Sequence, residues 1–178
     1  WGRDDVDCKS ESYLRWSDML QRCYNKKLHE RSPQYIGCEV CQEWKNYSNF
    51  KLWWDKHKPN YKVDIDKDIL FKGNKVYSPE TCAFVPHEIN TLFVNGKACR
   101  GELPVGVYYD TEKGKYRANM AFMGRSIKLG TFDTADEAFA RYKEDKEDFV
   151  KDIAEQYRKQ IPQKVYKAML NWKVEITD

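Results

Sequence analysis

The stretch Gly106–Lys143, GVYYDTEKGKYRANMAFMGRSIKLGTFDTADEAFARYK, decides the fold of the C-terminal half of this chain. It contains three short runs rich in β-branched and aromatic residues, VGVYYDT, KYRANMAFM and SIKLGTF, which are separated by the turn-forming stretches EKG and GR. Short runs of this kind between glycine turns predict three antiparallel strands.

A long helix is expected directly after these strands, from about Thr134 to Ile161. Apolar side chains recur along it at helical spacing, and Thr134 with Glu137 forms the pattern of a capping box. The predicted fold class is therefore α+β, with a three-stranded antiparallel sheet packed on this long helix. Pro162 begins a further short helix, and the run Lys173–Thr177 could add an edge strand.

The strands and the helix differ in the sign of their charge. Residues 106–131 carry five basic and two acidic side chains, a net charge of +3, whereas residues 133–157 carry four basic and nine acidic ones, a net charge of −5. Because the helix covers one face of the sheet, the other face is expected to be free and positive. A narrow, positive sheet can enter the major groove of DNA and gain binding energy from counterion release. The alternative is a plain solvated domain with an ordinary charge pattern.

The same stretch resembles the DNA-binding domain of plant ethylene-response (Apetala-type) factors and its phage relatives. The matching features are GV, then GK with an aromatic residue and a following Ala, then LGTFDTA, then EAF with a later Tyr. The resemblance implies that strand side chains read the major groove of double-stranded DNA. By position, the residues facing the DNA would be Tyr108, Asp110, Lys113, Asn119, Ala121, Ser126 and Lys128, and strand alternation adds Arg117. The plant domains place mostly Arg and Trp here, so base specificity does not carry over; Lys and Arg are expected to bind phosphates, and Asn119 could read a base edge.

The middle segment 64–90, DIDKDILFKGNKVYSPETCAFVPHEIN, predicts a strand, a polar loop with Asn74, a Ser-Pro turn and a short helix. The carboxylate of Asp66 and the side-chain carbonyl of Asn90 could hold a hard divalent cation, Mg²⁺ or Mn²⁺, together with water and phosphate oxygens. On spacing alone this signal is weak. The alternative is a surface loop followed by a helix-capping Asn.

Through SPETCAFVPHEIN, this segment also resembles the ββα-metal HNH fold of phage and homing endonucleases. The resemblance implies that Asn90 is a metal ligand, that Asn74 braces the hairpin, and that Asp66-Lys67 stands where that family has an Asp-His pair of metal ligand and general base. A lysine in a solvated loop beside two aspartates is protonated at neutral pH and cannot accept a proton from water. His87, one helical turn before Asn90, could substitute as the base, or Lys67 could instead contact a phosphate.

The N-terminal part is expected to be helical and to belong to the same HNH-like domain, residues 1–97. WSDMLQRCYN, YIGCEVCQEW and FKLWW look like the region that precedes the hairpin in the phage family. Helices are predicted for residues 10–25, capped by Ser10, and for residues 48–58, capped by Ser48, with extended segments at 35–40 and 61–65. The mixed stretch VNGKACRGELP, residues 94–104, predicts the boundary to an Apetala-type domain with a helical extension, residues 98–178.

The six cysteines do not form the pattern of a secreted disulfide framework and favour a reduced protein in the cytoplasm, that of the bacterial host in a phage setting. The pair Cys38 and Cys41 has only Cys23 and Cys82 as further ligand candidates, so buried thiols are favoured over a structural zinc site. The tryptophans and Phe50 between residues 44 and 54 are expected to lie in the core. No apolar run approaches the ~18 residues of a membrane span, and a chain without heptads is expected to be a monomer.

Three functions remain open on this reading. The first is a phage-type double-stranded DNA-binding protein whose degenerate HNH motif has lost most or all nuclease activity. The second is an active, divalent-metal-dependent HNH homing-type endonuclease or nickase. The third is a repurposed regulator or inhibitor of a host defence enzyme. Lys67 distinguishes the first two, and a failure to bind duplex DNA would point to the third.

Overall fold

Contacts within the chain divide it into two units, Trp1–Phe84 and Val85–Asp178. The structure, a computed structural model, describes residues 7–93, 102–176 and 178. The boundary predicted between residues 97 and 98 falls outside the described residues, whereas the division seen in the contacts follows Phe84. The α+β class is confirmed. Within the described ranges, no helix is both long and apolar enough to span a membrane.

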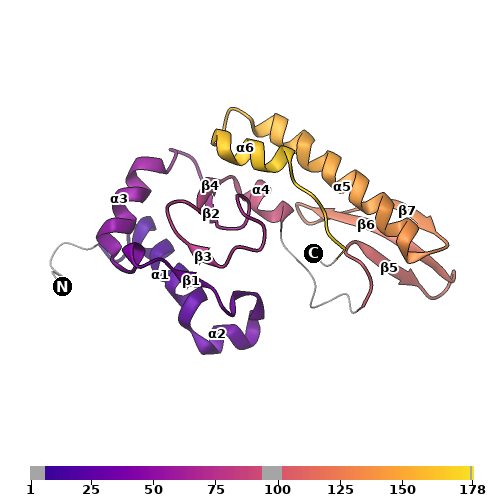
Figure 1. The fold of residues 1–178 in the computed structure, drawn as a ribbon, viewed down its shortest axis with the longest axis horizontal. Helices are drawn as coiled ribbons and strands as arrows, with labels where there is room; N and C mark the ends of the chain where they lie inside the picture. The colour runs from indigo at the N-terminus through magenta and orange to yellow at the C-terminus, as the bar shows by residue number, and fades with distance from the viewer. Residues whose placement is uncertain (1–6, 94–101, 177) are drawn as a thin grey trace. The chain divides into compact units, whose positions relative to one another are not determined.

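The first unit begins with short helices (Figure 1). They are α1 (Glu11–Tyr24), α2 (Lys26–Arg31), the 3-10 turns η1 (Pro33–Tyr35) and η2 (Glu43–Lys45), and α3 (Tyr47–His57). Ser10 caps α1 as predicted, because its hydroxyl accepts a hydrogen bond from the backbone N–H of Tyr13. The cap predicted for the second helix is wrong. Asn46, and not Ser48, is the N-cap of α3, because its side-chain oxygen accepts a hydrogen bond from the backbone N–H of Ser48.

Four short strands complete this part of the chain: β1 (Glu39–Val40), β2 (Asp64–Asp66), β3 (Val76–Tyr77) and β4 (Ala83–Val85). β1 pairs with β3 in parallel, and β2 pairs with β4. Both predicted extended segments contain a strand, but each strand is shorter than predicted. In the segment predicted at 35–40, only β1 is a strand, and residue 35 belongs to a 3-10 turn. In the segment predicted at 61–65, the strand covers 64–66. β3 lies between β2 and β4 in sequence and pairs away from both, so the segment is not a simple two-strand hairpin.

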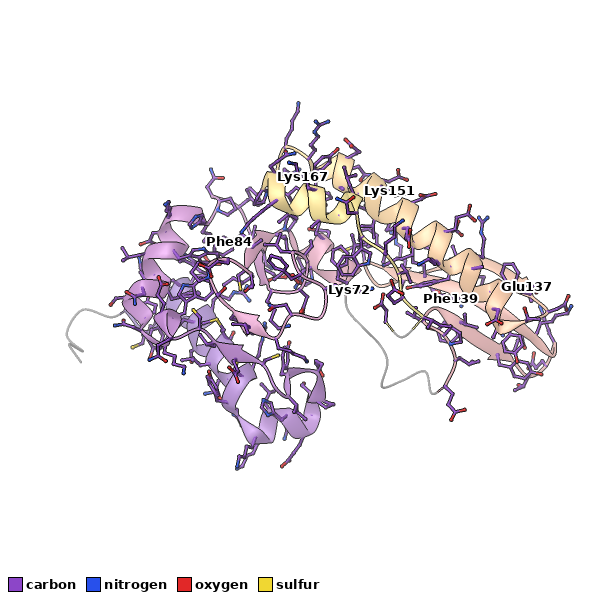
Figure 2. The ribbon with its side chains drawn as sticks, viewed as in Figure 1. Lys72, Phe84, Glu137, Phe139, Lys151 and Lys167 are labelled. Atoms are coloured by element: carbon purple, nitrogen blue, oxygen red, sulfur yellow. The ribbon has the colours of Figure 1, made fainter. Side chains whose placement is uncertain are left out.

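Aromatic rings fill the core of the first unit, as predicted. Trp44 and Phe50 are fully buried, and the ring of Trp53 stacks on that of Phe84 with centroids 4.7 Å apart (Figure 2). Cys23 and Cys82 are buried free thiols, and burial raises the pKa of each to about 12. Both thiols are therefore protonated at neutral pH and behave as small apolar side chains.

The second unit is a three-stranded antiparallel sheet with one long helix along it (Figure 1). Its elements are α4 (His87–Leu92), β5 (Val107–Asp110), β6 (Lys115–Phe122), β7 (Arg125–Phe132), α5 (Ala135–Tyr157) and α6 (Gln163–Leu170), with the sheet in the order β5-β6-β7. The capping box of Thr134 and Glu137 is confirmed, with both of its hydrogen bonds present. Ala118 and Met120 of β6 pack against Ala138 of α5, which fixes the helix on one face of the sheet.

The C-terminal tail does not form the predicted edge strand. Its backbone groups at Val174 form hydrogen bonds with side chains of α5 instead of with a strand. The N–H of Val174 donates to Glu147 at 3.0 Å, and the carbonyl of Val174 accepts from Lys143. Lys173 also pairs with Glu147, at 2.7 Å. Burial alone would raise the pKa of Glu147, but the hydrogen bonds from Lys173, Val174 and Lys143 lower it to about 2. An ionised carboxylate therefore holds the tail on α5.

Candidate nucleic-acid interface

The sheet of the second unit has a free face, opposite to the face that α5 covers. Side chains alternate along β6, so burial of Ala118 and Met120 places Arg117, Asn119 and Ala121 on the other side. The strand register adds neighbours from β5 and β7. The free face thus comprises Tyr108, Arg117, Asn119, Ala121, Ser126 and Lys128, paired as Tyr108 with Arg117, Asn119 with Lys128, and Ala121 with Ser126. Six of the residues predicted to face DNA therefore lie together.

Asp110 has a different position from the one predicted. Its side chain is only 4% exposed, so it cannot contact DNA directly. One carboxylate oxygen accepts the backbone N–H groups of Glu112 and Lys113, and the other lies 2.8 Å from a guanidinium nitrogen of Arg117. Asp110 thus fixes the guanidinium of Arg117, whose side chain stays 43% exposed. We reassign it from a DNA contact to a positioning residue.

Three cations stand at or beside the free face without a counter-ion. Lys128 lies on the free face and Lys113 in the turn before β6. Arg125 begins β7 beside the hairpin turn, where strand alternation places its side chain on the α5 side of the sheet. In residues 7–93, 102–176 and 178, no carboxylate forms an ion pair with any of these three. β6 has eight residues, or about 26 Å of strand, so the three charges are spread over a length comparable to several base pairs.

Asn119 lies at an irregularity that the sequence did not reveal. The register of β6 and β7 shifts between Ala118 and Asn119, so that Ala118 faces Gly130 while Asn119 faces Lys128. Such a bulge increases the local twist of the strands. The side-chain oxygen of Asn119 is buried and accepts no hydrogen bond from any described residue.

In the first unit, the HNH-like segment is held by its own hydrogen bonds. One oxygen of Asp66 accepts the backbone N–H groups of Asp68 at 2.8 Å and Ile69 at 2.6 Å. The ammonium of Lys67 donates to both oxygens of Asp68 at 2.7 Å and to the carbonyl of Asn74 at 2.8 Å. The expected solvated loop is wrong at these positions, because Asp66 and Lys67 are only 8% and 7% exposed. A phosphate could reach Lys67 only after these bonds break.

Asn74 closes the same loop. Its amide nitrogen donates to the carbonyls of Lys67 and Val76, and its amide oxygen accepts the N–H of Val76. The side chains of Lys67 and Asn74 therefore each donate a hydrogen bond to the backbone carbonyl of the other residue. These bonds brace the loop and position Asp66 at the end of β2.

Asp66 belongs to the first unit, whereas the other residues predicted for the HNH-like site, His87 and Asn90, belong to the second. Burial raises the pKa of Asp66 above its ordinary value, although its backbone partners oppose the shift. His87 and Asn90 belong to α4 in the second unit, one helical turn apart, with His87 exposed. Across the described part of the chain, no group of three or more His, Cys, Asp or Glu side chains could hold a metal ion. The predicted site of Asp66 and Asn90 stays a prediction, because it uses the amide oxygen of Asn90 and would take its other ligands from water and phosphate.

No family of known proteins, no curated protein and no solved structure matches this chain.

Proposed function

We propose that this chain binds double-stranded DNA through the free face of β5–β6–β7, and that its HNH-like segment is a scaffold with little or no nuclease activity. The observation that carries the proposal is the free face itself, where Arg117 and Lys128 lie on neighbouring strands; Arg125 lies beside the hairpin turn at the end of the sheet. The acidic side chains of α5 that are exposed lie away from its sheet-facing side, so they do not neutralise this face.

The physics of such a face favours phosphate binding. Each Lys or Arg that neutralises a phosphate releases counterions, so affinity falls as the salt concentration rises. Lys128 and Arg125 have no ion pair to break among the residues that the structure describes, and Arg117 is already fixed by Asp110. Fixing a long side chain before binding lowers the entropy cost of the contact. Asn119 is the candidate for a base edge, and its buried amide oxygen would reach one only after the side chain rotates.

The state of Lys67 supports reduced nuclease activity. Activation of water at a phosphodiester needs a base, and the amine of Lys67, which donates to Asp68 and Asn74, cannot serve as one. The second candidate function, an active metal-dependent endonuclease or nickase, would need another base such as His87, or water bound to Mg²⁺ or Mn²⁺. The bound form proposed here is a monomer in a reducing cytoplasm.

Incubation with supercoiled plasmid and Mg²⁺ or Mn²⁺ tests both parts of the proposal. We expect retarded migration of the plasmid without nicked circles. The matched control is Asp66→Asn, which keeps a side-chain oxygen for the N–H groups of Asp68 and Ile69 while removing the carboxylate.

Two outcomes would contradict the proposal. Nicking that disappears in Asp66→Asn would establish the endonuclease in place of the scaffold. A plasmid that is neither nicked nor retarded would exclude DNA binding and favour a protein partner.

A further inference from the structure

The turn between β6 and β7 contains a residue that does not suit its backbone. Met123 and Gly124 are the two central residues of this hairpin turn, and both have positive φ, 49° and 72°. Two-residue turns with positive φ at both positions favour Asn-Gly or Asp-Gly, because other side chains are strained there. Met123 is nevertheless present and its side chain is 49% exposed, so it contributes little to the core.

Met123 also lies at the end of the segment best shaped to enter a groove. The pairing of β5 with β6 ends at Val107 and Ala118, so residues 119–128 continue as a ribbon of two strands. The major groove of DNA admits a two-stranded ribbon. Lys128, Ser126 and Asn119 line the free face of this ribbon, and Arg125 follows the turn directly.

We propose that Met123 is an apolar wedge that inserts partly between neighbouring base pairs at the end of the ribbon. This inference rests on the proposed DNA binding. In proteins that bind the minor groove, apolar side chains, Met among them, unstack base steps and bend the duplex. A wedge at the tip of a ribbon in the major groove would act on the same base steps from the other side. The thioether of Met is unbranched and polarisable and makes favourable contacts with aromatic rings. Arg125, two residues later and without an internal ion pair, supplies the adjacent phosphate contact that holds the wedge in place.

The expected consequence is local unwinding of DNA, which can be measured without knowing the target sequence. Closed circular plasmid is relaxed in EDTA by a topoisomerase that needs no divalent metal, in the presence of saturating protein, and the topoisomers are separated after the protein is removed. The retardation of the same plasmid on a gel measures how much of the DNA is occupied by each protein. The variants are Met123→Asn, which suits positive φ and so does not threaten folding, Met123→Leu, which keeps an apolar wedge, and Leu52→Asn, a matched exposed apolar change in the first unit.

We expect the wild type, Met123→Leu and Leu52→Asn to leave negatively supercoiled topoisomers, and Met123→Asn to lose this shift at equal occupancy. An equal shift in Met123→Asn, or a bound wild type that causes none, would overturn the wedge while leaving DNA binding intact. A wild type that does not retard the plasmid would refute the DNA-binding proposal, and the wedge with it.

Discussion

Reversing the charges of Arg125 and Lys128 together, Arg125→Glu with Lys128→Glu, is expected to weaken binding to duplex DNA by about 100-fold, which corresponds to roughly 2.7 kcal/mol. Neither cation has a counter-ion within the described residues, so both charges are available to phosphates. Loss of two phosphate contacts should also make the plot of log affinity against log salt concentration less steep, reducing the magnitude of its negative slope by about 2. Fluorescence anisotropy with a labelled mixed-sequence duplex at several salt concentrations measures both quantities.

The matched control changes the net charge equally in the same unit but on its helices. Lys151 lies on α5 and Lys167 on α6 (Figure 2), and the control is Lys151→Glu with Lys167→Glu. Charges farther than ~8 Å from phosphates are largely screened at physiological salt, so this pair should change affinity only about threefold or less. Equal losses from both pairs would mean that net charge, rather than the free face, determines binding.

Gly106→Ala is expected to cause the largest loss of stability among single substitutions at the glycines of the second unit. Gly106 has φ +75°, and a Cβ atom there would lie 2.1 Å from a ring carbon of Tyr142. Tyr142 is buried between α5 and the sheet, so its ring has little room to move. The strained backbone and the overlap together should lower the free energy of unfolding by about 2–5 kcal/mol, measured by urea denaturation.

Gly124→Ala is the control for the backbone contribution alone. Gly124 has a similar φ, +72°, but nothing within 4 Å of an added Cβ. We expect it to cost only about 1–2 kcal/mol, the penalty of a left-handed alanine. If the two variants lose the same stability, the close approach of Gly106 to Tyr142 is not what requires glycine.

Local patterns were enough to predict the sheet and the long helix of the second unit. The strands were predicted by β-branched and aromatic runs between glycine turns, and the start of α5 by Thr134 and Glu137, because these signals act within a few residues. The C-terminal tail was not predicted correctly, since Val174 is bound by Glu147, which is 27 residues away. The parallel pairing of β1 with β3 was missed for the same reason. Glu39 pairs with Val76, and no pattern of neighbouring residues in the sequence indicates that pairing.

The candidate site was predicted only in part. The resemblance placed Asn119 and Lys128 on one face, and strand alternation correctly added Arg117, because the period-two alternation of side chains holds along β6. Burial of Asp110 and Lys67 was missed, since both are charged and follow or end short strands, where sequence alone suggests exposure. The diagonal relation of Asp110 and Arg117 across β5 and β6 is the signal that could have revealed their ion pair.

The central claim is that the free face of β5–β6–β7 contacts duplex DNA. Titration of ¹⁵N-labelled protein with a mixed-sequence duplex, followed by amide chemical shifts, tests it most directly. We expect the largest changes in amide chemical shift in β6 and β7, from Lys115 to Phe132, and at Tyr108 of β5. Shifts concentrated on the exposed side of α5 or in the first unit, or no shifts at all, would contradict it.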